Sequence, residues 1–308
     1  MDDRRRLHIY LLLAAMPLFY ASNQVIGRYV VLSAPPVGLA FWRWAIAFAL
    51  LLPFCRRGLR VCAPALRAEW RSLLLLGFLG MVVCGAVVYE GLRYTTATNG
   101  TLIFSAAPVA IVILDWLWRG RRMSAVEGIG VAAALVGVTT IICRGDPDVL
   151  FGFRFNSGDL GMVAGALAWS VYSLVLKRPA LQALPTLPLF AAIAGTGALL
   201  LAPGALLEGL FVGGPPARGD VWLGILGLAV VPSLLAFLSF QIGVKAVGPS
   251  LTGLFAYLMP IYGVLMAVIF LGESFEPYHA AGMALTVSGV ALATAQGSVR
   301  RLRRAARA

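Results

Sequence analysis

The sequence is poor in charged residues and in the side chains that usually bind metals. Of its 308 residues, 12% are charged and 2 are histidines, whereas an ordinary soluble domain carries about 25% charged residues. His8 and His279 are far apart, and the 4 cysteines show no CxxC spacing. A zinc site is therefore disfavoured. We expect free thiols, no metal and no cofactor.

The sequence also lacks the motifs of two classes of protein, those driven directly by ATP and membrane-embedded enzymes. It contains no GxxxxGK[ST] phosphate-binding loop, so ATP is not the expected direct energy source. It shows no nucleophile spaced with a base, which a membrane-embedded enzyme would need. We therefore expect a protein that is not an enzyme.

Apolar residues, in contrast, make up 60% of the chain. They form runs of the length, about 20 residues, that one helix needs to cross a bilayer. The fold class expected is an all-α integral membrane protein with ten transmembrane helices. The predicted segments are 7–32, 36–56, 70–93, 97–118, 124–143, 158–177, 185–207, 219–245, 249–272 and 278–298.

The net charge of +12 invites comparison with nucleic-acid-binding proteins, but the basic residues lie at helix ends and form no basic face. Most of them fall on the side of the N-terminus, whereas Arg93, Arg144, Arg154 and Arg218 fall at the opposite ends. Positive charge is retained on the cytoplasmic side of membrane proteins. We therefore predict no nucleic-acid partner and both termini in the cytoplasm.

The chain repeats itself. Gly91 and Gly243, Pro108 and Pro260, and Gly137 and Gly289 are each separated by 152 residues, and the run between them needs no gap. Ten helices divide into five and five, so the second half must enter the membrane from the opposite side. The sequence thus predicts two inverted repeats, 1–145 and 146–308, around a central cavity, an arrangement typical of secondary transporters.

Several short motifs carry a family resemblance: Phe41-Trp42-Arg43, Trp169-Ser170-Val171-Tyr172, and Gly272-Glu273 with Gly282 and Gly289 after it. Together they make the chain resemble the ten-helix, EamA-type branch of the drug/metabolite transporter superfamily, which includes bacterial exporters of amino acids and other metabolites. The resemblance implies a cavity lined by helices 1, 3, 4, 6, 8 and 9, with helices 5 and 10 outside it. The chain departs from the family where Arg121 occupies the position equivalent to Glu273, which puts a symmetric role for that glutamate in doubt.

Aromatic and polar residues on these inner helices are the candidates for substrate binding. Interhelical hydrogen bonding and anchoring at the membrane surface are the alternative explanations for them. A cavity of aromatic rings with a few amides and hydroxyls suits an apolar or aromatic amino acid. The candidates are Tyr20, Asn23, Tyr89, Ser105, Trp169, Tyr172, Phe237, Gln241 and Tyr257.

Two further groups have predicted roles. Pro108, Pro260, Gly80 and Pro232 are repeat-related weak points that could act as hinges, although a proline can also bend a helix only for packing. Arg43 and Glu90 are charged residues inside predicted spans. We expect them to form an ion pair or gate, and the alternative is that one of them receives a zwitterionic substrate.

These inferences together predict a secondary transporter in a bacterial inner membrane that exports small metabolites, amino acids first, by alternating access. An importer, an exchanger and a channel remain open alternatives. The expected partners are a small-molecule substrate and the lipid bilayer. The protein is expected to be a monomer or a homodimer formed through helices 5 and 10.

Overall fold

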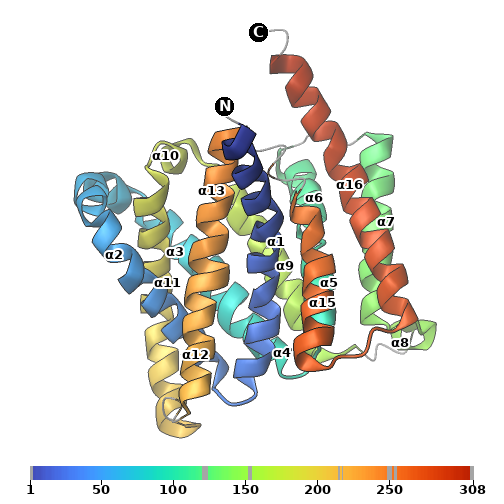
Figure 1. Ribbon diagram of the computed structural model, residues 1–308, viewed down its shortest axis with the longest axis horizontal. Helices are drawn as coiled ribbons and strands as arrows, with labels where there is room; N and C mark the ends of the chain where they lie inside the picture. Colours follow the sequence, from blue (N-terminus) through green and yellow to red (C-terminus); the bar gives the residue numbers. More distant parts are fainter. Residues whose placement is uncertain are drawn as a thin grey trace.

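The computed structural model describes residues 3–119, 124–151, 155–213, 216, 218–247, 252 and 255–305. These residues are overwhelmingly helical and contain no strand (Figure 1). Eight of the described helices are long and apolar enough to cross a membrane, and Ala256–Leu271 is a shorter apolar helix. The expected all-α membrane fold is confirmed, and both termini lie on one face.

The helices follow the predicted segments in order. The first half contains α1 (Asp3–Val31), α2 (Pro36–Ala68), α3 (Trp70–Gly77), η1 (Phe78–Val87), α4 (Val88–Leu92), α5 (Ala97–Phe104), α6 (Ala107–Arg119) and α7 (Ala125–Ile142). The second half contains α8 (Pro147–Phe151), α9 (Ser157–Val175), α10 (Pro179–Gln182), α11 (Thr186–Phe211), α12 (Gly219–Leu228), η2 (Ala229–Leu235), α13 (Ala236–Val247), η3 (Ala256–Leu258), α15 (Met259–Leu271) and α16 (Pro277–Ala305).

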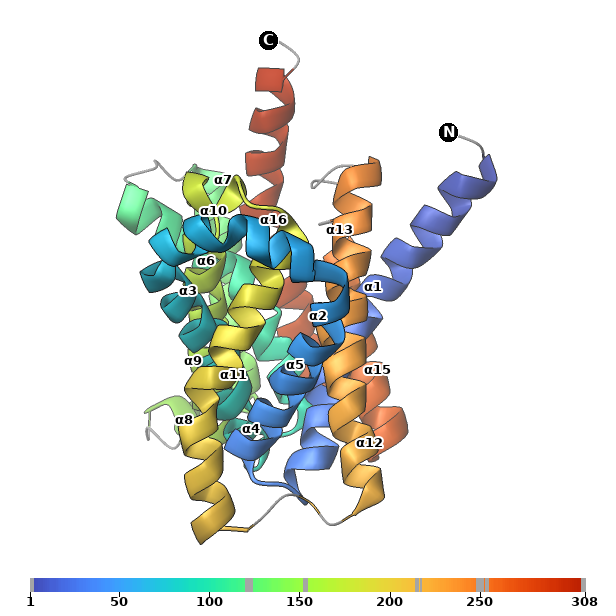
Figure 2. The same ribbon diagram turned by 90° about the vertical axis from the view of Figure 1, so that its left-hand side faces the viewer.

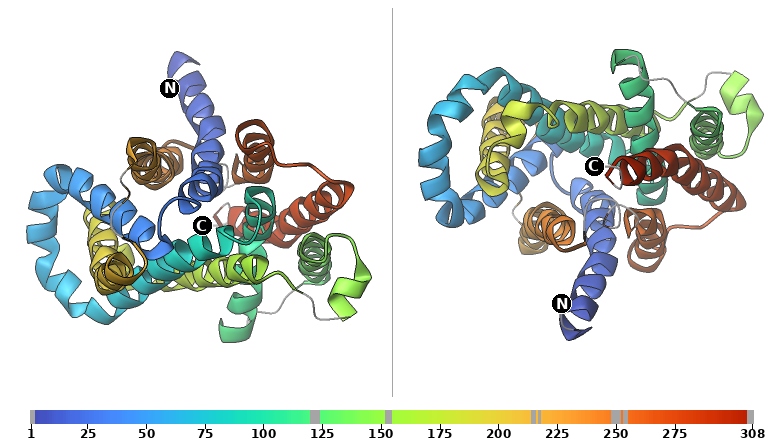
Figure 3. Two further views of the ribbon diagram at one scale, coloured as in Figure 1. Left: turned by 90° about the horizontal axis from the view of Figure 1, so that it is seen from below. Right: turned by 90° about the horizontal axis from the view of Figure 1, so that it is seen from above.

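Helix α2 is longer than expected. The sequence predicts an end at residue 56, but α2 continues through Pro53 and Pro64 to Ala68 and curves around α11 (Figure 3). A proline removes one backbone donor and bends a helix without necessarily ending it. Here the continuation also buries Cys62 and Leu66 against the core, which stabilises the bent extension.

Matched irregularities interrupt the third and eighth predicted segments. Gly80 lies in the π-helical segment η1 and Pro232 in the π-helical segment η2, and these two residues are repeat partners. Gly80 has a local reason to be small, because a Cβ there would lie 2.9 Å from the ring of Tyr172. Widened π-helical turns are rare and frequently occur at functional sites.

The fourth and ninth segments are also broken at related places. Helix α5 ends at Phe104 and α6 begins at Ala107, so the break precedes Pro108. Pro260 lies in the first turn of α15, directly after the 3₁₀ turn η3. The first residues predicted for the ninth segment, 249–251, lie outside the described residues. Two helices thus break where each half carries its repeated proline.

The pairing of α7 with α16 shows how the halves are related (Figure 1). A Cβ on Gly130 would lie 2.7 Å from the carbonyl oxygen of Gly289, and a Cβ on Gly137 would lie 2.7 Å from that of Gly282. Gly130 and Gly282 are repeat partners, as are Gly137 and Gly289. Each contact therefore occurs twice in reversed order, as a two-fold axis across antiparallel helices requires.

A second antiparallel pair, α2 with α11, lies at the other end of the molecule (Figures 1 and 2). Gly204 contacts Val37 near the start of α2, and Gly195 contacts Phe48 further along it. Between the two pairs, α1 packs with α12, η2, α13 and α15, while α9 packs with η1, α4, α5 and α6. The candidate site is built from residues of these two groups together with residues of α2 and α11.

Candidate substrate-binding site

Arg43 is the centre of a buried polar cluster that joins four elements. Its side chain reaches from α2 to Asn23 of α1, Tyr89 of α4 and Ser233 of η2. Nη1 donates to Asn23 Oδ1 at 2.6 Å and to the Tyr89 hydroxyl at 2.5 Å, and Nε donates to Ser233 Oγ at 3.0 Å. Arg43 is 6% exposed. A charged side chain at this depth is costly, so its surroundings must compensate for it.

Aromatic rings supply part of that compensation. The guanidinium carbon of Arg43 lies 4.6 Å from the ring centroid of Trp44 and 5.9 Å from that of Tyr89, close enough for cation–π attraction. Trp44 meets Phe190 of α11 edge-on, and Phe190 stacks on Phe237 of α13 with 4.0 Å between centroids. The guanidinium therefore sits beside an aromatic wall built from both halves.

The predicted pair between Arg43 and Glu90 is wrong. Glu90 instead forms an ion pair with Arg93 at 3.4 Å, and the two side chains are 45% and 39% exposed. Tyr89 and Glu90 are consecutive residues of α4, so their side chains point about 100° apart around the helix. Since Tyr89 is fully buried and bonds to Arg43, Glu90 must face away from the cluster.

A second aromatic pair forms on α9. Trp169 and Tyr172 stack with 5.0 Å between centroids and 9° between ring planes. Tyr172 is buried and rests against Gly80, whereas Trp169 is 37% exposed. Tyr20, the repeat partner of Tyr172, is partly buried in α1. The stacked pair presents one ring that can contact a solute and one that is held in place.

Three other candidates do not join the Arg43 cluster. The Ser105 hydroxyl donates to the carbonyl of Leu102 at 2.6 Å in its own helix, which matches the alternative explanation of local hydrogen bonding. Tyr257 packs against the cluster of Val109, Ala134, Val290 and Ala293. Gln241 is partly buried in α13. Whether these residues line a shared cavity stays a prediction.

Sequence reasoning missed three members of the cluster. Ser233 is the repeat partner of Met81, so the internal repeat gives no polar signal there, although its position directly after Pro232 marks it as belonging to an irregular turn. Trp44 and Phe190 give no distinguishing signal in the sequence, because aromatic residues occur throughout its apolar segments. Ser233 also donates to the carbonyl of Leu228 at 2.9 Å, which satisfies an acceptor at the end of α12.

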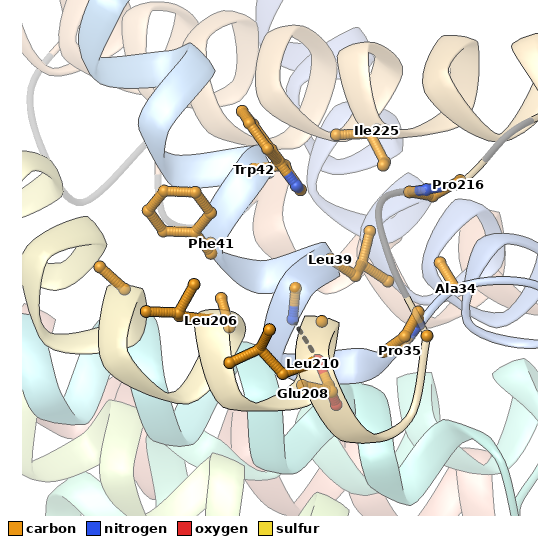
Figure 4. Close-up of a pocket in the computed structure, with 15 residues that line it drawn as sticks. Ala34, Pro35, Leu39, Phe41, Trp42, Leu206, Glu208, Leu210, Pro216 and Ile225 are labelled. Atoms are coloured by element: carbon orange, nitrogen blue, oxygen red, sulfur yellow. Dashed lines mark hydrogen bonds between the residues drawn. The ribbon is translucent and has the colours of Figure 1, made fainter.

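A mostly apolar pocket lies elsewhere in the described part of the molecule. It has a volume of about 430 Å³ and opens between the start of α2, the end of α11 and Ile225 of α12 (Figure 4). Its walls are mostly apolar, and its carboxylate, Glu208, accepts from the backbone N–H of Gly38 at 2.6 Å. That carboxylate is thereby engaged in capping α2. None of the predicted cavity residues lines this pocket.

Polar contacts link several helices on the face opposite the termini. Asp159 of α9, which is fully buried, accepts hydrogen bonds from Thr95 and from Asn99 Nδ2. The Asn99 side-chain oxygen in turn lies 3.0 Å from His279 Nε2 of α16. Arg28 of α1 donates to the carbonyl of Leu92. Of these contacts, the one between Arg28 and Leu92 links the α1 group to the α9 group, whereas the N-terminal part of α1 leans away from the bundle at the other end (Figure 2).

Comparison with known proteins identifies relatives over most of the chain. An uncharacterized transporter, YyaM of Bacillus subtilis, is 26% identical over 96% of this chain and 96% of its own. The aromatic amino acid exporter YddG of Ancylobacter novellus is 29% identical over 67% of this chain and 70% of its own. A probable terminal-alkyne amino-acid exporter of Streptantibioticus cattleyicolor is 28% identical over 83% and 82%.

A crystal structure that shares 24% identity matches 94% of this chain and 97% of its own with a TM-score of 0.61, which supports the fold alone. The sequence profile of the EamA-like transporter family matches the chain twice, at residues 7–143 and 156–295. The chain therefore belongs to the EamA-like transporter family of the drug/metabolite transporter superfamily, and it is a multi-pass membrane transporter of small molecules rather than an enzyme.

Proposed function

We propose that this transporter exports apolar and aromatic amino acids across a bacterial inner membrane, with both termini in the cytoplasm. One observation carries the substrate class: a buried guanidinium surrounded by an amide and hydroxyls lies beside an aromatic wall of Trp44, Phe190 and Phe237. Rings and methylene groups favour an apolar side chain, while a few fixed polar groups favour its charged backbone end. The names of two relatives, both exporters of amino acids, support the same class.

The mechanism proposed is alternating access, in which one group of helices rocks against the other. Repeats 1–145 and 146–308 would supply equivalent moving parts, and the matched irregular turns at Gly80 and Pro232 and the breaks before Pro108 and Pro260 are the proposed hinges. Hinges are places where a few residues absorb a change in backbone angles. The contacts of Arg28 with Leu92 and of Glu273 with Ala97 and Thr98 join the two groups on the side away from the termini, and they support a state closed on that side.

The test is counterflow in liposomes. Purified protein is reconstituted, the vesicles are loaded with an excess of unlabelled phenylalanine, and uptake of trace labelled phenylalanine, leucine or glutamate is followed. We expect saturable uptake of phenylalanine and leucine that depends on the internal load, and little uptake of glutamate.

Three other results would contradict the proposal in distinct ways. Flux that does not saturate would indicate a channel. Uptake confined to anionic or sugar substrates would reject the substrate class. Inverted vesicles that accumulate no amino acid, when right-side-out vesicles do, would show that the direction is import.

A further inference from the structure

Arg43 has no anionic partner among the residues that the structure describes. Its three hydrogen bonds all go to neutral oxygens, those of Asn23, Tyr89 and Ser233. Within the described residues, the ion pairs given by the structure are Arg93 with Glu90 and Arg218 with Asp220, and neither includes Arg43. A buried charge that lacks its counter-charge is strongly unfavourable. Proteins usually retain such a charge for a functional reason.

One nitrogen of the guanidinium, Nη2, is also free to bind. Nη1 and Nε are used by the three neutral acceptors, whereas Nη2 makes no hydrogen bond to any described residue. The fully enclosed polar atoms without a partner include Trp44 Nε1 but not Arg43 Nη2. Nη2 therefore faces accessible space, and a second unpaired donor, the indole N–H of Trp44, belongs to the ring against which the guanidinium lies.

A guanidinium with free N–H groups matches a carboxylate or a phosphate, because its planar fork can donate two parallel hydrogen bonds. The aromatic rings beside Arg43 favour a carboxylate that carries an apolar side chain. The neutral acceptors are suited to hold Arg43 in place while the site is empty. An arriving carboxylate would take Nη2 directly, and it would gain a second bond by displacing Ser233 from Nε. An anionic acceptor adds a direct attraction between opposite charges, which a neutral hydroxyl cannot supply and which is strong away from bulk water, so this exchange is favourable.

We propose that Arg43 is the receptor for the carboxylate of the transported molecule, so that the substrates are organic carboxylates with an apolar or aromatic side chain. The side chain would lie along the wall formed by Trp44, Phe190 and Phe237. This inference deepens the proposed function and rests on it. It makes Arg43 the residue that separates carboxylated substrates from amines of the same shape.

The experiment compares matched competitors in the counterflow assay with labelled phenylalanine. Phenylalanine and 3-phenylpropionate carry the carboxylate, whereas phenethylamine lacks it and phenylalaninamide replaces it with a neutral amide. Wild type should be inhibited by the first two at least tenfold more strongly than by the last two. Arg43→Gln should raise the KM for phenylalanine at least tenfold and remove the difference between phenylalanine and phenethylamine. Arg43→Lys should retain part of the preference.

The control variant is Arg93→Gln, which removes an exposed arginine paired with Glu90 and should leave the preference unchanged. Equal inhibition of wild type by phenylalanine and phenethylamine would overturn the proposal. So would an Arg43→Gln protein that keeps the preference. If Arg43→Gln does not fold, the wild-type competitor series still decides.

A second readout separates this inference from the substrate proposal. The thermal unfolding temperature of detergent-purified wild type and Arg43→Lys is measured with each of the four compounds. Labelled amino acids could fail to be transported while 3-phenylpropionate, but neither amine, still raises the unfolding temperature of wild type. In that case the amino-acid function fails and the carboxylate site stands. If none of the carboxylates stabilises wild type more than its matched amine, the carboxylate site fails.

Discussion

The carboxylate of Glu273 accepts a hydrogen bond from the backbone N–H of Ala97 at 2.7 Å, and a second from the N–H of Thr98 at 2.9 Å. Ala97 opens α5 in the first half, whereas Glu273 follows α15 in the second. The first N–H groups of a helix have no partner inside it and carry partial positive charge. A carboxylate from one half thus fastens the helix start of the other, on the face away from the termini.

Glu273→Gln should weaken the contact with the start of α5, because the glutamine amide lacks the negative charge and one of the two acceptor oxygens. We expect a loss of about 0.5–2 kcal/mol, the usual range for a helix cap, and faster hydrogen exchange at Ala97 and Thr98. Exchange measured by mass spectrometry checks this. Glu90→Gln, an exposed change on the first half, is the control. Unchanged exchange in Glu273→Gln would show that the contact does not hold the face closed.

Gly130→Ala should destabilise the protein, because its Cβ would lie 2.4 Å from the backbone nitrogen of Ala293 and backbone atoms cannot move aside cheaply. Overpacking of this kind costs about 1–3 kcal/mol. Thermal unfolding in detergent measures it. Gly209→Ala is the matched control, since nothing lies within 4 Å of its Cβ position in α11, and it should be neutral or slightly stabilising. Equal unfolding temperatures in the two variants would refute the close crossing of α7 and α16.

Trp169→Ala, Gln241→Ala and Tyr257→Ala should each weaken transport while the protein stays folded and inserted. For Trp169 the expected effect is a several-fold rise in KM, since a lost aromatic contact costs about 0.5–1.5 kcal/mol. Trp169→Phe, which keeps a ring beside Tyr172, should have a KM close to that of wild type. Counterflow kinetics decide the point, and normal transport by all three alanine variants would mean that the predicted cavity lining is wrong.

A cysteine placed at Asp146 should react with a membrane-impermeant maleimide on intact cells, in a variant whose four cysteines are replaced by serine or alanine. Asp146 is exposed in the turn after α7, where Arg144 and Gly145 adopt positive φ angles of 55° and 73°. A cysteine added at the N-terminus should react only after the membrane is permeabilised. The reverse pattern would show that the whole protein, with both predicted repeats, has the opposite orientation in the membrane.

The sequence predicted the course of the helices well because apolar length is a local property. The segments 97–118 and 158–177 correspond to α5–α6 and α9 within a few residues. It was less successful where proline was treated as a stop, since α2 passes through two prolines. It failed for the pair of Arg43 and Glu90, because a position inside a predicted span does not give the direction of a side chain around its helix.

The amino-acid sequence by itself determined that this is a helical membrane protein built from a repeated unit, since the bilayer demands long apolar helices and the 152-residue offset is visible in the glycines and prolines. Only the tertiary structure decided which side chains meet. Arg43 finds Asn23, Tyr89 and Ser233 because of how α1, α2, α4 and η2 rotate and cross. Those rotations depend on packing between residues far apart in the chain, and no local pattern records them.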